Sequence, residues 1–328
     1  MPAPALNAAL LSLTGALLLA SLLIGPAGIA PGTALLALVQ DQGATTLVMR
    51  EIRLPRALLG VCVGASLGLG GAAMQGYLRN PLAEPGLLGV SSSAALGAVL
   101  AIQTGLAAAF APALPLAALA GAALSGAAIL LLAGPRGPSL TLILAGIAIS
   151  ALAGALTSLV LNLSPNPFAA TEIVFWMLGS LADRSFSHLW LALPFMAAGA
   201  LLLLRLGPAL DALTLGEDAA ATMGVRLLRL RLSVVAGVAA MVGAATAVAG
   251  TVGFVGLVVP HLLRPLVGAR PSRLLPASAL GGAAMVLAAD VAVRLILPER
   301  DLKLGVLTAL VGAPVFLHLI YATRRRLG

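Results

Sequence analysis

The chain has little charge, few aromatic side chains, one cysteine and one lysine. Charged residues make up 9% of its 328 positions and aromatic residues 3%, whereas about a quarter of a soluble domain is charged. Cys62 alone cannot form a disulfide or a cysteine metal site within the chain. Lys303 is the only lysine and belongs to no G-x-x-x-x-G-K-[ST] loop, so the chain is not itself a P-loop ATPase and we expect no enzyme activity of its own.

Metal, cofactor and nucleic-acid sites are also not indicated. The histidines His188, His261 and His318 are dispersed, with no carboxylate at metal-ligand spacing, so we expect neither a metal site nor a cofactor. The net charge is +8, but the basic residues are scattered at the ends of apolar segments, and aromatic residues that could stack on bases are few. Membrane orientation explains this charge better than nucleic-acid binding.

Apolar residues dominate the sequence and divide it into membrane-spanning segments. Hydrophobic residues make up 60% of the chain, and the mean hydropathy is +1.09. We predict an all-α polytopic membrane protein with about ten transmembrane helices, forming one domain over residues 1–328 and contacting lipid throughout. The predicted spans are 5–25, 57–77, 87–106, 112–133, 140–162, 188–206, 229–249, 252–268, 274–296 and 303–322. Segments 33–49 and 168–183 read as shorter, interfacial helices, and Pro260, His261 and Arg264 interrupt the eighth span.

The basic residues favour one orientation in the membrane. Ten spans place both termini on the same side, and most basic residues lie at cytoplasmic ends if that side is the cytoplasm. The exceptions gather at the openings of the second and the ninth to tenth spans, where the outer face has a basic cluster of Arg50, Arg53, Arg56, Arg294 and Arg300. We therefore expect a multi-pass protein of a bacterial cytoplasmic (inner) membrane with both termini cytoplasmic.

The second span and the turn after it have unusual composition. Gly60, Gly64 and Gly68 repeat every four residues, which strips one helix face of side chains and predicts close packing against another helix. The span is followed by a polar hairpin, 79–86, that contains two prolines. Such backbone needs protein or water around it, so the hairpin either lines a pathway or is an ordinary loop between helices.

Residues 213–231 form the longest polar interruption, on the cytoplasmic side in this topology. Glu217 and Asp218 suit the start of a short helix, and Gly224 can end it in a left-handed turn. This helix either fits a groove on a partner or lies on the lipid headgroups with the arginines of 226–231 beside it.

Asp290 is the one acidic residue well inside a predicted span. An acid at that depth is a functional candidate, but Arg294 follows one helical turn later and offers an ion pair, which we favour. A secondary transporter would be expected to have coupling acids near the membrane midplane. An intramembrane enzyme would need a converging nucleophile, base or metal cluster, and none is visible in the sequence.

Several long motifs in order give the chain a specific resemblance, from about residue 50 to 322. It strongly resembles the permease subunits of type II ABC importers for iron-siderophores, haem and cobalamin. The motifs are Arg53–Arg56, Met74–Gly76, Asn80–Ser91, Leu215–Ala220, Gly253–His261 and Gly305–Pro314. The resemblance implies a homodimer of ten-helix subunits with the pathway on its axis, two cytoplasmic ATPase subunits and a periplasmic or lipid-anchored substrate-binding protein.

The same resemblance implies roles for individual residues. Arg53, Arg56 and Arg294 match arginines that receive acidic side chains of the binding protein. Asn80 and Leu82 match a cytoplasmic gate. Ser139 matches a second gate, although the proline-rich 134–138 before it departs from the family pattern. Residues 215–225 match the helix that couples to the ATPase, with contacts expected from Leu215, Gly216, Glu217, Asp218, Ala219, Ala220, Met223 and Gly224.

The expected function is ATP-driven, binding-protein-dependent import of an iron chelate. Nothing in the chain itself identifies the ligand, and the ranking of cargoes is ferric siderophore first, haem second and cobalamin third. The alternative is a ten-helix secondary transporter that is not coupled to ATP.

Overall fold

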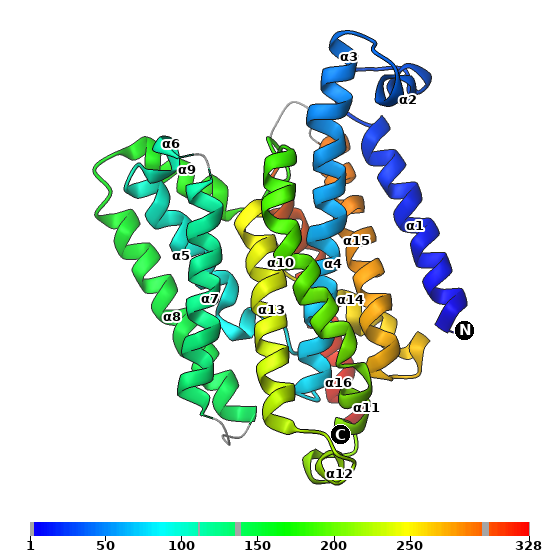
Figure 1. The fold of residues 1–328 in the computed structure, drawn as a ribbon, viewed down its shortest axis with the longest axis vertical. Coiled ribbons are helices and arrows are strands. Elements are labelled where there is room, and N and C mark those ends of the chain that lie inside the picture. Colours follow the sequence, from blue (N-terminus) through cyan, green and yellow to red (C-terminus); the bar gives the residue numbers. More distant parts are fainter. Residues whose placement is uncertain (1–2, 111, 135–138, 297–301, 328) are drawn as a thin grey trace.

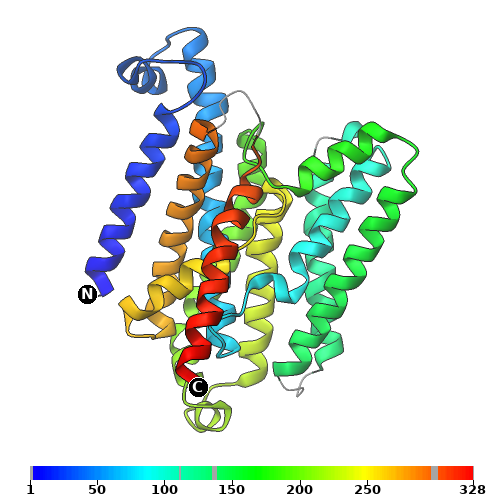
Figure 2. The same ribbon diagram turned by 180° about the vertical axis from the view of Figure 1, so that it is seen from behind.

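The structure, a computed structural model, describes residues 3–110, 112–134, 139–296 and 302–327. Within these ranges every regular element is a helix (Figures 1 and 2). Seven helices are long and apolar enough to cross a membrane. They are α1 (Ala3–Leu23), α4 (Leu54–Tyr77), α7 (Ala113–Ala133), α8 (Ser139–Asn162), α10 (Phe186–Arg205), α13 (Leu227–Ala249) and α15 (Pro271–Ile296). The prediction of an all-α membrane protein is confirmed.

Three shorter apolar helical stretches bring the number to ten. They are α5 (Val90–Gln103), α14 (Val255–Leu263) with the 3-10 turn Arg264–Val267, and α16 (Leu304–Leu327), whose apolar part runs to His318. The short helices between them are α2 (Pro31–Val39), α3 (Ala44–Leu47), α6 (Leu106–Ala109), α9 (Pro167–Met177), α11 (Gly207–Leu213) and α12 (Glu217–Thr222). A 3-10 turn, η2 (Pro85–Leu88), precedes α5.

Two boundaries near the N-terminal third differ from the prediction. Segment 33–49 is not one helix, because the chain turns at 40–43, where Asp41 Oδ1 accepts the Gly43 N–H at 2.9 Å and Gly43 has a φ of +60°. The second span starts earlier than residue 57, since α3 continues through a π-helical stretch, Val48–Arg53, into α4. Pro55 follows the π-helical stretch directly, at a local change of helical hydrogen bonding where a residue without an N–H can be accommodated.

The eighth span is shorter than predicted, and the interfacial segment 168–183 is helical only as α9. Gly250, with a φ of +70°, ends α13, and the chain stays non-helical until Val255. Phe254 also has a positive φ, 66°, immediately before α14 begins. Pro260, His261 and Arg264 weakened the helix prediction for this span, but the backbone at Gly250 and Phe254 is what excludes residues 250–254 from the helix.

The core is built on α4 and α13. In each of these helices, 78% of an 18-residue apolar stretch is buried inside the protein. The predicted glycine face is confirmed, because α4 meets α15 almost backbone to backbone. A Cβ on Gly68 would lie 2.0 Å from the carbonyl oxygen of Ser278, and one on Gly64 would lie 2.3 Å from that of Gly282. Only glycine allows this approach, so the repeat fixes the crossing of α4 and α15.

The helices form a central group with one helix and one bundle flanking it. In Figure 1, α5 to α9 stand together on the left and α1 on the right, with α4, α10, α13, α15 and α16 between them. The start of α1 and the end of α16 lie toward the end of the molecule where α12 projects, and α2 and α3 lie at the opposite end (Figures 1 and 2). These two ends are called the α12 end and the α2 end below.

Candidate functional site

At the α2 end, one buried carboxylate holds two arginines from different helices. Arg56 on α4 donates from Nε and Nη2 to Asp290 Oδ1 at 2.9 and 2.8 Å, and Arg294 donates from Nη2 to Asp290 Oδ2 at 2.7 Å. The Asp290 side chain is 2% exposed. The expected pair with Arg294 is confirmed, whereas the pair with Arg56 was missed, because it joins residues 234 positions apart.

Arg53 lies at the same end but takes no part in that ion pair. It is 5% exposed, and its Nη1 donates to the main-chain oxygens of Leu22 and Leu23 at 2.8 and 3.0 Å. The structure thus brings the three arginines to one end of the fold and gives each a partner within the chain. Their docking role remains a prediction.

The polar hairpin after α4 is organised by its own side chains. Arg79 has a φ of +50°, and Asn80 Oδ1 accepts the main-chain N–H of Leu82 at 3.0 Å, which closes an Asx turn. Asn80 is exposed, Leu82 half-buried and Ala83 buried. The two predicted gate residues therefore lie in one tight turn at the α12 end of α4.

Glu84 ties this hairpin to the discontinuous eighth segment, a contact that sequence analysis missed. Its Oε1 accepts the N–H of Phe254 at 3.0 Å, immediately before α14, so a carboxylate faces the positive end of that helix. Burial raises the pKa of Glu84 above its usual range, and the hydrogen bond from Phe254 opposes the rise.

The predicted coupling segment 215–225 contains a six-residue helix, α12, with a defined end. The N–H of Gly224 bonds to Ala221 O at 2.9 Å and that of Val225 to Ala220 O at 3.0 Å, which is a Schellman motif. Gly224 has a φ of +88°, so the predicted left-handed turn is confirmed. Glu217 and Asp218 occupy the first turn, as expected.

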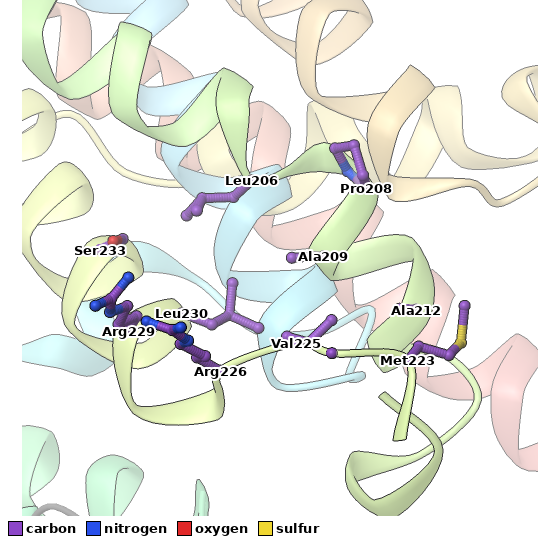
Figure 3. A pocket seen from close by; sticks show the side chains of 11 residues that line it. Leu206, Pro208, Ala209, Ala212, Met223, Val225, Arg226, Arg229, Leu230 and Ser233 are labelled. Atoms are coloured by element: carbon purple, nitrogen blue, oxygen red, sulfur yellow. The ribbon is translucent and has the colours of Figure 1, made fainter. Parts of the chain in front are cut away.

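Apolar side chains beside α12 are exposed at both of its ends. Leu215 is 68% and Met223 63% exposed, whereas Ala220 is fully buried and anchors the helix. A cavity of about 500 Å³ opens next to it, between α11 and the start of α13 (Figure 3). Arg226 and Arg229 line one side of this cavity and Met223 another (Figure 3). The arrangement combines exposed apolar groups with cationic ones on one surface.

A hydrogen bond joins the coupling segment to α8, and two more join the preceding helix α11 to α15. Ser139, at the start of α8, donates from Oγ to Glu217 Oε1 at 3.3 Å. Asp211 on α11 accepts the N–H and Oγ–H of Ser272 at 2.8 and 2.5 Å, at the start of α15. The structure therefore places the second predicted gate residue against the first residue of α12. The proline-rich 135–138 before Ser139 lies outside the described residues.

Metal-ligating side chains do not cluster in the described ranges. No group of three or more His, Cys, Asp or Glu residues there could hold a metal ion. His261 lies on α14, His188 on α10 and His318 on α16.

The family model for the FecCD transport family matches residues 13–322. The chain belongs to the FecCD transport family. Among curated relatives, the uncharacterized ABC transporter permease protein YvrB of Bacillus subtilis is 40% identical over 293 residues, 87% of this chain and 82% of the relative. The vitamin B12 import system permease protein BtuC of Klebsiella pneumoniae is 39% identical over 310 residues, 94% of this chain and 91% of that protein.

A solved structure gives the same result for the fold of this FecCD family member. A metal-chelate type ABC transporter in an inward-facing conformation superposes with a TM-score of 0.87 and 34% identity, covering 97% of this chain and 99% of that one. The resemblance inferred from the motifs is confirmed. The protein is a multi-pass permease subunit of an ABC transporter, in which the ATPase is a separate subunit.

Proposed function

We propose that the protein is the membrane-spanning subunit of an ATP-driven, binding-protein-dependent importer that carries a metal chelate across the bacterial cytoplasmic membrane. The observation that carries the proposal is the 39% identity to a vitamin B12 import permease over 94% of the chain. In this orientation the α12 end, with both chain ends near it, is cytoplasmic, and the α2 end faces the binding protein.

The name of that relative makes cobalamin the first cargo to test, ahead of the ferric siderophore that the sequence ranking favoured. Proteoliposomes containing the permease with its ATPase and binding protein should accumulate labelled cyanocobalamin when ATP is supplied on the ATPase side. A ferric hydroxamate and haem serve as competing cargoes, and vesicles with ADP as the control. Accumulation of the ferric hydroxamate but not of cyanocobalamin would restore the sequence ranking.

The coupling role is assigned to residues 215–225 in a complex of two permease copies and two ATPase subunits. Exposed Leu215 and Met223 flank a helix whose own apolar anchor, Ala220, is buried. Covering exposed apolar side chains lowers the free energy of the system. This surface is therefore suited to contact with a partner protein rather than with bulk water. A cross-link between a cysteine at position 215 and the ATPase, present in the assembled complex only, would test the assignment.

The gate is assigned to the Asn80–Leu82 turn, facing its own copy across the two-fold axis of a homodimer. In a Cys62→Ala background, a cysteine at position 80 should cross-link between protomers in one nucleotide state and lose that reactivity in another. A cysteine at position 79, which is also exposed, is the neighbouring control. Failure to cross-link in every nucleotide state, while a control pair elsewhere on the axis reacts, would place the gate elsewhere.

Docking of the binding protein is assigned to the arginines at the α2 end. Positive charge on an outer face runs against the general membrane bias, and complementary charge steers association in a salt-dependent way.

The alternative, a secondary transporter, is disfavoured because Asp290, its best candidate for a coupling acid, is engaged by both Arg56 and Arg294. Uptake that persists without ATP but requires an ion gradient would support that alternative.

A further inference from the structure

One arginine at the start of α13 is buried, although its neighbours in the sequence face solvent. Arg226 and Arg229 are exposed and line the cavity beside α12 (Figure 3). Arg231, two residues after Arg229, is only 8% exposed. A guanidinium is costly to bury unless its N–H groups find acceptors. The acceptors of Arg231 therefore indicate what it contributes to the subunit.

The first acceptor belongs to the helix that leads into the Asn80–Leu82 turn. Arg231 Nε donates to Tyr77 Oη at 3.0 Å, and both side chains are buried. Tyr77 is the last residue of α4, and Arg79, with its φ of +50°, opens the hairpin two residues later. The start of α13 is thus bonded to α4 immediately before the first predicted gate.

The second acceptor belongs to the helix that precedes the other predicted gate. Arg231 Nη1 donates to the main-chain oxygen of Gly134 at 2.9 Å. Gly134 ends α7 with a φ of +65°, and the last carbonyls of a helix need donors from outside it. Ser139 begins α8 five residues later. The same guanidinium therefore also holds the chain just before the second predicted gate.

These two acceptors lie in different parts of the fold. In Figure 1, α7 stands in the α5–α9 bundle and α4 in the central group, and α13 contacts both helices. A guanidinium has a rigid, planar arrangement of donors. Arg231 therefore fixes the ends of α4 and α7 relative to each other as well as to α13.

Arg231 also follows the coupling segment closely along the chain. Only residues 223–226 separate the end of α12 from the start of α13, and the Val225 N–H bonds back to Ala220 O at 3.0 Å. Arg231 lies in the second turn of α13, which is a continuous helix from Leu227 onward. Rigid helices transmit displacements along their length. A movement of α12 can therefore reach Arg231 through a short, hydrogen-bonded connection.

A second route from α12 to the Ser139 region is weaker. It consists of the bond from Ser139 Oγ to Glu217 Oε1, which is 3.3 Å long and exposed to solvent. The bonds of Arg231 are shorter, carry a charged donor and are partly or wholly buried, and such bonds are stronger than exposed ones. The buried route is therefore the better mechanical link.

We infer that Arg231 is a positioning residue that joins the start of α13 to the ends of α4 and α7, so that movement of the coupling segment reaches both gate turns together. The inference rests on the proposed roles of residues 215–225 and of the two gates. The hydrogen bonds that support it do not depend on those roles.

The test compares cargo uptake with ATP hydrolysis in the same proteoliposomes, which contain the permease, its ATPase and its binding protein. Labelled cyanocobalamin is the probe, and the ferric hydroxamate replaces it if that cargo is the one accumulated. Arg231→Met keeps an apolar stem of similar length but removes every donor. Tyr77→Phe removes only the Oη acceptor of Arg231 Nε.

Loss of the link should separate hydrolysis from transport. Arg231→Met should lower uptake about tenfold while hydrolysis stays within about twofold of the wild type, so that more ATP is consumed per cargo molecule. Tyr77→Phe should lower uptake per ATP by about two- to threefold, because the bond to Gly134 remains. In the Arg231→Met background, Tyr77→Phe should have no further effect, since the bond that it removes is already absent.

Arg264→Met is the matched control for the loss of a guanidinium that bonds to α4. Arg264 is half-buried, and its Nη2 donates to Gln75 Oε1 at 2.8 Å, but it lies after α14 rather than after the coupling segment. Its removal should change uptake and hydrolysis in proportion, together with the Tm of the complex. A parallel loss of uptake and hydrolysis in Arg231→Met, as in this control, would show a purely structural role and overturn the inference.

Arg231→Lys keeps the test usable if Arg231→Met does not assemble. An ammonium keeps the charge but not the planar fork that spans Tyr77 Oη and Gly134 O. This variant should give a value of uptake per ATP between those of the wild type and Arg231→Met. Wild-type uptake per ATP in both Arg231→Lys and Tyr77→Phe would overturn the inference.

Failure of the inference can be distinguished from failure of the proposed function. If the wild type takes up cargo at the expense of ATP and Arg231→Met does so equally well, the inference alone fails. If wild-type vesicles hydrolyse ATP but accumulate none of the three cargoes, the proposed import function fails. The inference is then judged by the cross-link of a cysteine at position 80, which should respond to nucleotide in the wild type and not in Arg231→Met; the same behaviour in both would overturn it.

Discussion

The arginine–aspartate cluster at the α2 end and the coupling segment at the α12 end place their charged side chains in different surroundings. At the α2 end, Arg53 and Asp290 are buried and Arg294 is half-buried, and all three are bonded within the chain, whereas at the α12 end Glu217 and Asp218 are exposed on a short helix. Buried charges that bond internally shape the subunit. Exposed charges beside exposed apolar groups shape a surface for another subunit, so charge alone does not identify an interface.

The most sensitive test of this difference removes one acidic side chain from each end and compares the effects on stability. Asp290→Ala should lower the free energy of unfolding by about 3 kcal/mol, because it leaves the half-buried Arg56 and Arg294 without their shared partner. Asp218→Ala, on an exposed helix, should change it by less than about 0.5 kcal/mol. Denaturant titration in detergent measures both. Equal losses of stability would mean that the acidic side chains at the two ends contribute equally to folding.

A second test concerns the exposed apolar groups beside α12. Leu215→Ala combined with Met223→Ala should reduce affinity for the ATPase by about 2 to 3 kcal/mol, roughly 30- to 150-fold, if both side chains are buried on binding. Stability of the isolated permease should not change. Leu131→Ala, a substitution on α7 at an 82% exposed position, is the matched control, and an equal loss there would argue against a localised interface.

A third test concerns the left-handed backbone conformation at Gly224, which ends the helix of the coupling segment. Gly224→Val should cost about 1 to 2 kcal/mol, because a β-branched residue is strained at a φ of +88°. ATP-dependent uptake should fall while the subunits still assemble. Gly15→Val is a control at a position where a Cβ meets nothing within 4 Å, and wild-type uptake in Gly224→Val at normal expression would contradict the coupling role.

The smallest expected effect tests the link between α8 and α12. A double-mutant cycle of Ser139→Ala and Glu217→Ala should give a coupling energy of about 0.5 kcal/mol, since the bond of 3.3 Å lies in an exposed setting. Stability of the single and double variants measures it. Strict additivity would show that Ser139 acts, if at all, without Glu217.

Sequence was sufficient for the features that depend on local composition. Apolar runs gave the ten helical segments, and the repeat of Gly60, Gly64 and Gly68 gave the buried face of α4. The left-handed turn at Gly224 followed from one residue type at the end of a short helix. In each case the information lies within a few turns of chain.

The contacts that organise the site join segments far apart in the chain. They could not be predicted from local sequence. Nothing near Arg56 in the sequence indicates that Asp290 is its partner, and nothing near Arg53 indicates that it caps α1. The Glu84 bond to Phe254 also depends on a backbone break that periodicity cannot detect. Resemblance supplied the family, but the hydrogen bonds of each arginine came from the structure.

The crossing of α4 and α15 also limits how this protein can change over evolutionary time. The contact is reciprocal, since a Cβ on Gly64 would strike the oxygen of Gly282, and a Cβ on Gly282 would lie 2.1 Å from the oxygen of Gly64. A larger residue at either position cannot be compensated by a smaller one opposite, because both positions are already glycine. No single substitution is therefore neutral there, and variation must accumulate in other parts of the subunit.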